Sequence, residues 1–233
     1  MEYMRIEDQF PRLNNCAVTL GKFDGIHRGH RKLMDKILER KKETGVHAVV
    51  LAFVSDRKTV LTNSERRDFL EHMGADILLE CPLTSDIRHM KADTFVRQVL
   101  AGSLKASYVA IGEDFRFGFE RKGTPEFLKK SGVKYGFEVE ILPKEMDGSR
   151  KISSTYIREE LAKGNMEKYL PCWDLIILFP GSLEHGRGMG RRGIFSYCKP
   201  DPLAGKASAS KWCLYYSVQL RTGDLSGHYQ CGI

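Results

Sequence analysis

Two histidines near the start of the chain have the clearest potential for chemistry. His27 and His30 lie in a turn that follows the apolar run Cys16 to Leu20 and precedes a helical pattern. The same turn contains three glycines, Gly21, Gly25 and Gly29. Glycines let a backbone approach a ligand closely, and imidazoles three residues apart can point to the same side of a helix start. We interpret the turn as a cradle for a polyphosphate, although an isolated pair of this kind is more often merely exposed.

A second polar turn follows a later apolar run. The segment Gly112 to Gly118 contains Asp114, Phe115 and Phe117 between its two glycines. Aromatic residues at this spacing are more often part of a core than of a binding site. Asp114 with its flanking glycines is therefore the better candidate for shaping a site.

A third segment places hydroxyl groups and a cation at the start of a helix. Ser153, Ser154 and Thr155 come first, and Arg158 follows on the first turn. Hydroxyls and backbone amides at a helix start attract anions, and a guanidinium can bind phosphate. The segment could also be a simple helix cap, but in combination with the histidine turn it predicts a second anion site.

The elements that position these turns alternate between strands and helices. Strands are predicted at 16–20, 46–53, 77–79, 108–111 and 137–142, and helices at 28–42, 63–73, 93–100, 125–132 and 154–163. Asn63 or Ser64 is the predicted cap of the second helix, and Gly132 the predicted end of the fourth. This alternation predicts an α/β fold with a Rossmann-like parallel sheet and helices on both faces. Ligands of such sheets bind beyond the carboxyl ends of the strands, where the three turns should lie.

The composition is that of an ordinary soluble globular protein. The chain has 233 residues, 42% of them hydrophobic, and no apolar run approaches the length that spans a bilayer. Without a signal-like start we expect a cytoplasmic protein with no membrane partner, and its six cysteines are expected to be free thiols. The net charge of +7 is distributed among interspersed acids, so nucleic acid is not an expected partner. The oligomeric state is not predicted.

Together these segments resemble a known family. The turn Gly21 to His30 resembles the H-x-G-H signature of nucleotidylyltransferases, and in full that of bacterial bifunctional FAD synthetases, which combine riboflavin kinase and FMN adenylyltransferase. The segments Gly112 to Gly118, Ile152 to Arg158 and Leu61 to Arg67 are similar to further family motifs in the same order. The resemblance covers nearly all of residues 14–167. It implies a nucleotidylyltransferase-type domain at 1–167 that transfers AMP from ATP to FMN, with Mg²⁺ accompanying ATP.

The resemblance also implies roles for individual residues. His27, His30 and Arg158 would be catalytic, with the histidines stabilising the triphosphate as its α-phosphorus is attacked. The residues implied to bind ATP or FMN are Gly21, Lys22, Phe23, Asp24, Gly25, Gly29, Gly112, Asp114, Phe115, Phe117, Ser153, Ser154 and Thr155. No metal ligand is predicted. Many members carry a Phe-Asp-Pro-His-Pro-like stretch where this chain has Phe53-Val54-Ser55-Asp56-Arg57-Lys58, a departure that concerns flavin binding rather than ATP binding.

The chain beyond residue 167 departs further from the family. Gly181 to Gly193 resembles the opening strand and glycine loop of the riboflavin kinase domain, but the Pro-Thr-x-Asn motif that should follow is replaced by Ser196-Tyr197-Cys198-Lys199. Codons for these residues, read one base later, can encode Pro-Thr. We therefore interpret 168–233 as a truncated, frame-shifted kinase remnant, forming at most an incomplete β-barrel without kinase activity. Alternatives for the whole chain are another H-x-G-H nucleotidylyltransferase, or a non-catalytic protein that binds nucleotide or flavin.

Overall fold

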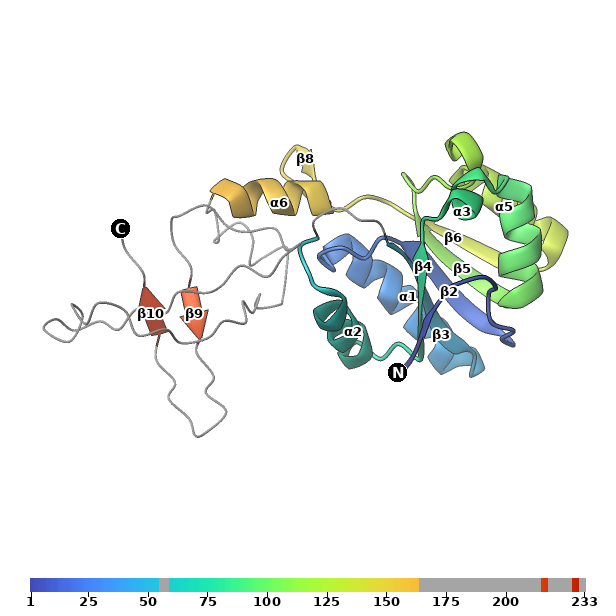
Figure 1. Ribbon diagram of the computed structural model, residues 1–233, viewed down its shortest axis with the longest axis horizontal. Helices are drawn as coiled ribbons and strands as arrows, with labels where there is room; N and C mark the ends of the chain where they lie inside the picture. The colour runs from blue at the N-terminus through green and yellow to red at the C-terminus, as the bar shows by residue number, and fades with distance from the viewer. Residues whose placement is uncertain (55–58, 164–214, 218–227, 231–233) are drawn as a thin grey trace, which may run out of the picture.

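Six parallel strands form the central sheet of the protein. The computed structural model describes residues 1–54, 59–163, 215–217 and 228–230 (Figure 1). The strands of the sheet are β1 (Glu2–Arg5), β2 (Cys16–Gly21), β3 (His47–Val54), β4 (Ile77–Pro82), β5 (Ala106–Gly112) and β6 (Glu138–Leu142). Their order is β1-β4-β3-β2-β5-β6, and every neighbouring pair is parallel. The predicted Rossmann-like parallel sheet is confirmed.

The strand order changes direction between β2 and β5. From β2 the chain proceeds through β3 to β4 on one side, and then returns to place β5 and β6 on the other side of β2. In open parallel sheets this change of direction leaves a crevice beyond the carboxyl ends of the two central strands, and ligands bind there. Gly21 ends β2 and Gly112 ends β5, so the first two predicted turns begin at this crevice.

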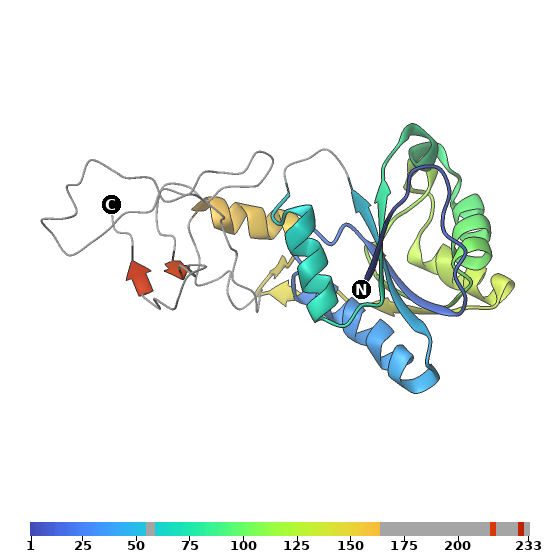
Figure 2. The ribbon, with the colours of Figure 1, turned by 60° about the horizontal axis from the view of Figure 1, so that its bottom comes forward.

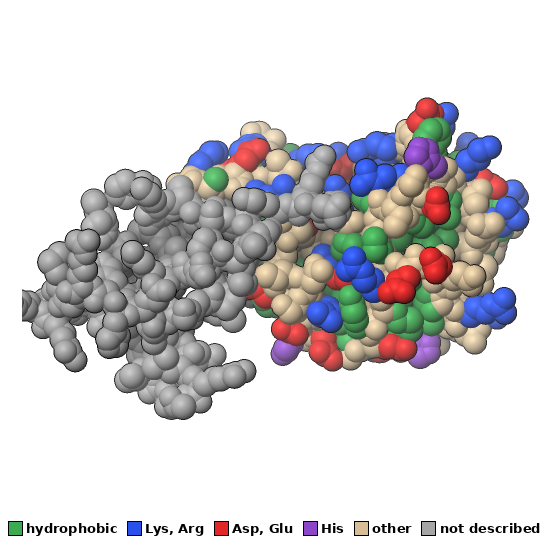
Figure 3. Space-filling model, in the orientation of Figure 1, with side chains coloured by type: hydrophobic (Ala, Val, Ile, Leu, Met, Phe, Trp, Pro, Cys, Tyr) green, Lys and Arg blue, Asp and Glu red, His purple; other side chains and the backbone are tan. Residues whose placement is uncertain are grey.

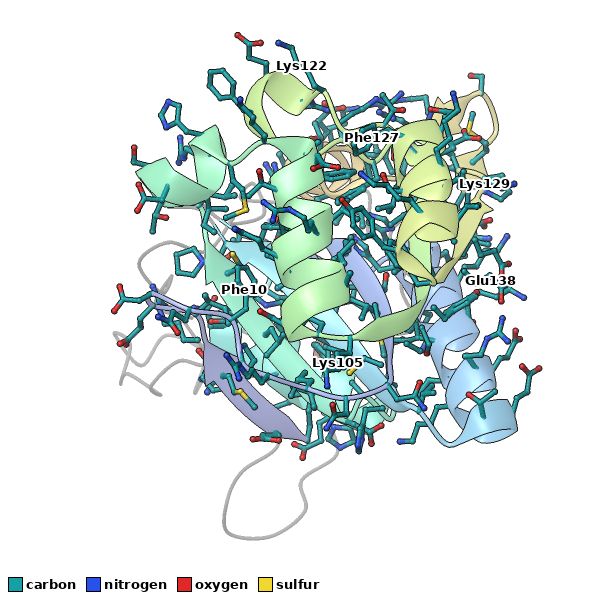
Figure 4. All side chains as sticks on the ribbon, turned by 90° about the vertical axis from the view of Figure 1, so that its right-hand side faces the viewer. Phe10, Lys105, Lys122, Phe127, Lys129 and Glu138 are labelled. Atoms are coloured by element: carbon teal, nitrogen blue, oxygen red, sulfur yellow. The ribbon has the colours of Figure 1, made fainter. Side chains whose placement is uncertain are left out.

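Helices cover both faces of the sheet, as predicted (Figures 1 and 2). On one face α1 (Arg28–Thr44) and α2 (Asn63–His72) bury their apolar sides against alternate strand residues such as Ala17 and Val50. On the other face the helices η1 (Phe95–Ser103) and α5 (Pro125–Tyr135) pack on residues such as Val18. Figure 4 views this second face, with η1 and α5 in front of the sheet.

Two predicted helix boundaries were wrong. The cap of α2 is Thr62, whose hydroxyl accepts a hydrogen bond from the Glu65 N–H in a capping box, rather than Asn63 or Ser64. Helix α5 continues past Gly132 to Tyr135. Gly132 is needed inside the helix because a Cβ there would lie 2.5 Å from the Phe137 carbonyl oxygen.

The predicted helix at 93–100 exists but is not a plain α-helix. A short α4 (Ala92–Thr94) leads directly into η1, which has π-helical hydrogen bonds. Sequence periodicity did not indicate this, because the spacing of Phe95, Val96, Val99 and Leu100 fits either geometry. Such π-helical segments are frequent at functional sites.

Several short elements were not predicted. They are the edge strand β1, the helix α3 (Ser85–His89), the 3-10 turn η2 (Phe119–Arg121) and the hairpin strands β7 (Met146–Asp147) and β8 (Arg150–Lys151). The predicted last helix is α6 (Ser154–Lys163). Most of the predicted kinase remnant, and the domain boundary at 167, lie outside the described residues. Within that region the structure describes only the antiparallel pair of β9 (Tyr215–Ser217) and β10 (His228–Gln230).

A buried ion pair fixes α2 to the sheet. Arg66 of α2 pairs with Glu80 of β4, and both side chains are almost completely removed from solvent. Glu80 also accepts a hydrogen bond from the Tyr3 hydroxyl of β1 at 2.8 Å, which joins the edge strand to the same pair. Buried charges of this kind are tolerated only when paired and hydrogen-bonded.

Candidate functional site

A cavity of about 660 Å³ opens at the carboxyl ends of the central strands. Gly21 of β2 and Gly112 of β5 both line it, so it occupies the crevice that the strand order creates. Its volume is in the range of sites that bind drug-sized or cofactor-sized molecules. The three predicted turns would have to meet here if they act on one ligand.

The structure brings most of the predicted site residues together around this cavity. Of the predicted set the lining includes Gly21, Lys22, His27, Gly29, His30, Gly112, Asp114, Phe115, Phe117, Ser153, Ser154, Thr155 and Arg158. The histidine turn and the serine/threonine/arginine segment are more than a hundred residues apart in sequence. The parallel sheet places both at the same edge, which only the tertiary fold can do.

Three predicted binding residues do not line the cavity. Phe23 is fully buried, and its ring stacks on the imidazole of His30 with centroids 4.7 Å apart. Gly25 has φ of 87°, in the region that favours glycine, and so allows the turn to reverse. Asp24 is 6% exposed, and its carboxylate accepts hydrogen bonds from Val60 and Arg158. These three residues support the conformation of the histidine turn and do not line the cavity.

The two histidines form a stacked pair at the start of α1. Their ring centroids are 3.8 Å apart with an interplanar angle of 20°, and each residue is only 9% exposed. His27 is the N-cap residue just before α1, and its side chain makes no capping bond to the helix. Among the residues that the structure describes, Nδ1 of each ring has no hydrogen-bond partner.

Burial keeps this pair uncharged. It lowers the pKa of His27 to about 4, against a smaller opposing effect of the Asp114 carboxylate. Burial also lowers the pKa of His30 well below its usual value, and the neighbouring His27 adds to the effect. Near neutral pH both rings are therefore neutral imidazoles, each with one N–H to donate and one nitrogen to accept. Such groups can bind phosphate oxygens without the cost of burying two cations next to each other.

Bonds between the turn and α6 close one wall of the cavity. The Ser154 hydroxyl donates to the backbone carbonyl of Asp24, and Nη2 of Arg158 donates to Oδ2 of Asp24 at 3.0 Å. The side chain of Arg158 is 36% exposed and lines the cavity. The histidines and the guanidinium therefore face one space from two segments that are bonded to each other.

Another part of the cavity lining, here called the apolar wall, consists of hydrophobic side chains. It is formed by Phe53, Leu83, Ile87, Met90, Phe95, Phe115 and Phe117. Phe115 stacks on Phe117 with ring centroids 5.6 Å apart. The ring centroids of Phe117 and Phe95 are 5.5 Å apart. Phe117 is buried in the core, the commoner place for an aromatic residue at this spacing, and it also lines the cavity. A flat apolar ring would match this wall.

Several lining residues were not identified from the sequence. The additional charged residues are Arg88, Arg116, Glu120, Arg121, Lys144 and Glu145. Arg116 lies inside the predicted Gly112 to Gly118 turn and could have been included. Ile87 belongs to α3 and Met90 follows it directly. No spacing signal predicted this short helix, and the place of both residues in the lining depends on how it packs.

Three lysines form ion pairs between segments that border the cavity. Lys151 lies 3.6 Å from Asp114, and Lys144 lies 3.4 Å from Glu113, so the segment before α6 is linked to the turn after β5. Lys32 of α1 pairs with Glu145 of the same segment. Over the face of the molecule in Figure 3, Lys and Arg side chains are interspersed with Asp and Glu. Within the described ranges no group of three or more His, Cys, Asp or Glu could hold a metal ion.

The fold and the cavity define a class of protein. A parallel sheet with a crevice at its change of strand direction, lined by hydroxyl, imidazole and guanidinium groups and by aromatic rings, defines an α/β protein with a Rossmann-like ligand-binding crevice. Comparison with known proteins gives the family. Residues 9–156 match the family model of FAD synthetase, and the chain belongs to that family.

Similar proteins agree with this assignment. The chain is 28% identical over 186 residues to the bifunctional riboflavin kinase/FMN adenylyltransferase of Escherichia coli (strain K12), covering 76% of this chain and 59% of that protein. It is 31% identical over 192 residues to the protein of the same description from Pseudomonas fluorescens, covering 78% and 61%. The chain thus spans about 60% of the length of the curated relatives it matches. The predicted family resemblance is confirmed.

A solved structure shows the same fold. The crystal structure of a macrolide-efflux protein from Streptococcus pneumoniae superposes with a TM-score of 0.67 at 27% sequence identity, covering 74% of this chain and 70% of that one. In the part of the chain that the structure describes, no helix has the length and apolar character needed to cross a membrane.

Proposed function

We propose that this chain is an FMN adenylyltransferase, which transfers AMP from ATP to FMN and so forms FAD and pyrophosphate. The observation that supports it most is one cavity whose polar wall suits a triphosphate and whose apolar wall suits a flavin ring. In the reaction an FMN phosphate oxygen attacks the α-phosphorus of ATP, and the bond from that phosphorus to the β-phosphate oxygen breaks. The FMN phosphate is already anionic near neutral pH, so the attack requires no strong general base.

The polar wall supplies the charge stabilisation that this reaction needs. We assign His27 and His30 to donate hydrogen bonds to phosphate oxygens as negative charge develops on the leaving pyrophosphate. Arg158 and the hydroxyls of Ser154 and Thr155 bind the triphosphate from the opposite segment. Groups that are fixed before the substrate arrives stabilise developing charge without reorganising, which is the main source of rate in such transfers.

The apolar wall holds the flavin in this proposal. The stacked rings of Phe115 and Phe117, with Phe53 and Phe95 beyond them, offer flat contacts to an isoalloxazine ring. Aromatic pairs contribute about 0.5–1.5 kcal/mol beyond simple burial. In this proposal the isoalloxazine ring contacts the apolar wall, and the phosphate end of FMN extends toward the histidines.

Mg²⁺ is expected to enter with ATP. The cavity carboxylates Asp114 and Glu145 already pair with Lys151 and Lys32, so most ligands of the ion would come from phosphate oxygens and water. Bound there, the ion would neutralise part of the phosphate charge. Asp114 is the side chain on the polar wall that could contact it through water. Because both substrates are metabolites of the cell interior, we also propose a cytoplasmic location.

The riboflavin kinase activity of the relatives is proposed to be absent from this chain. The proposal depends on the replacement of the Pro-Thr-x-Asn motif by residues 196–199, which lie outside the described residues. Incubation of the full chain with riboflavin and ATP should yield no FMN. Formation of FMN would refute this part of the proposal.

Pyrophosphate release by the full chain tests the adenylyltransferase function directly. Release should require ATP and FMN together, and chromatography should detect FAD as the second product. Replacing His30 by Ala should lower turnover at least about tenfold, on the usual scale for one lost contact of this kind. The exposed His47, at the opposite end of the sheet, gives a matched control in which His47→Ala keeps full turnover.

The result can also favour another function. Pyrophosphate release with a different phosphorylated acceptor and not with FMN would identify another H-x-G-H nucleotidylyltransferase. Binding of ATP or FMN without any release would indicate a non-catalytic protein.

A further inference from the structure

The carboxylate of Asp24 joins three segments that are distant in sequence. Its Oδ1 accepts a hydrogen bond from the backbone N–H of Val60 at 2.6 Å, and its Oδ2 accepts one from Nη2 of Arg158 at 3.0 Å. The backbone carbonyl of the same residue accepts the hydroxyl of Ser154. The histidine turn, the segment before α2 and the start of α6 therefore meet at one residue.

Asp24 is placed to act on another residue and not on substrate. Its side chain is 7% exposed and does not line the cavity, whereas Arg158 does. A desolvated carboxylate requires partners for its charge, and here a backbone N–H and a guanidinium provide them. The carboxylate in turn fixes one side of the guanidinium.

We infer that Asp24 is a positioning residue of the proposed adenylyltransferase, which holds the guanidinium of Arg158 in place at the cavity wall for the triphosphate of ATP. The inference rests on the proposed function of this site. A guanidinium has five N–H donors in a planar fork, so it can bind a carboxylate with one donor and phosphate oxygens with others. Free long side chains lose rotamer entropy when a ligand immobilises them, and the bond to Asp24 removes much of that loss beforehand.

The rival explanation is that Asp24 merely holds the fold together. Both explanations predict a loss of stability when the residue is changed, but only the positioning role predicts that its effect on ATP depends on Arg158. A double-mutant cycle measures this dependence. Asp24→Asn is the suitable variant, because its amide oxygen can still accept the Val60 N–H while the charge is lost.

The cycle uses the full chain with Mg-ATP as the probe in isothermal titration calorimetry. Asp24→Asn should weaken ATP binding about tenfold when Arg158 is present, and less than about twofold in the Arg158→Gln background. In steady-state assays the same variant should raise KM for ATP and leave KM for FMN unchanged. Equal weakening of ATP binding with and without Arg158 would overturn the inference.

Asp76 offers a matched control at the other end of the sheet. Its Oδ2 accepts the Ala48 N–H at 2.9 Å, and its Oδ1 pairs with Nζ of Lys41 at 2.6 Å, so it too joins a backbone N–H to a basic side chain, although its side chain is more exposed, at 29%. Asp76→Asn should lower the melting temperature and leave ATP affinity unchanged. A comparable loss of ATP affinity in this control would mean that loosening the fold is enough, and would count against positioning.

A second variant covers the case in which Asp24→Asn does not fold. Asp24→Glu keeps the charge but moves it by one methylene, and so should displace the guanidinium and weaken ATP binding only when Arg158 is present. The outcomes also separate the two proposals. If the wild-type chain binds ATP but makes no FAD from FMN, the proposed function fails, and the ATP-affinity cycle still decides the role of Asp24.

Discussion

Acid should destabilise this protein through the buried histidine pair. His27 has a pKa of about 4 in the folded state because burial disfavours its charged form, whereas an exposed histidine has its usual value of 6.5. Above pH 6.5 both the folded and unfolded states hold a neutral ring, and the group has no effect. Between pH 6.5 and 4 only the unfolded state binds the proton, so the free energy of unfolding falls as the pH falls. Below pH 4 both states bind it and the loss levels off.

The size of the effect follows from the displacement of the pKa. A difference of roughly 2.5 pH units corresponds to about 3 kcal/mol in full. About 1 kcal/mol of this should be lost by pH 5.5 and most of the rest by pH 4.5. His30 adds in the same direction, because its pKa is also lowered by burial and by its neighbour. A loss of this size is a large fraction of the stability of an ordinary domain, which is about 5–15 kcal/mol.

Urea denaturation followed by circular dichroism at about pH 7.5, 6.5, 5.5 and 4.5 measures this loss. Other groups also titrate in this range, so the informative quantity is the difference in pH dependence between wild type and His27→Gln. That difference cancels any pH-independent cost of the substitution itself. The variant should lose less stability between pH 6.5 and 4.5, by about 2–3 kcal/mol. The exposed His47→Gln should behave as wild type, and identical slopes for His27→Gln and wild type would refute the reasoning.

Two further predictions concern the frame that positions the site. Gly132→Ala should lower the free energy of unfolding by about 1–3 kcal/mol, because the new Cβ meets the Phe137 carbonyl oxygen at 2.5 Å. In Gly136→Ala the added Cβ would have no atom within 4 Å, and the cost comes from strain at a φ of 82°. This variant should lower the free energy of unfolding by only about 1 kcal/mol. Urea denaturation measures both variants, and a larger loss for Gly136→Ala than for Gly132→Ala would contradict the packing. Glu80→Gln leaves the charge of Arg66 buried without its partner and should cost about 3–5 kcal/mol. A melting temperature unchanged from wild type would show that this ion pair does not stabilise α2 on the sheet.

Local sequence determined the main elements because their signals are local. The apolar runs before Gly21 and Gly112 predicted buried strands, and the strand-helix alternation predicted a parallel sheet. The histidine turn could be identified because glycine, histidine and helix-start residues are close together in the chain. Boundaries such as Thr62 and Gly132 were less accurate, because a cap or a glycine is decided by which neighbour it contacts.

The sequence by itself determined which residue types are available for the chemistry, and the tertiary structure decided which of them face one space. His27 and Arg158 are in one cavity because parallel strands end at the same edge of the sheet, a relation that no local spacing records. The same packing turns Asp24 away from the cavity and onto Val60 and Arg158. It also sets the pKa of the histidines, since desolvation depends on what surrounds a ring in space and not on its neighbours in the chain.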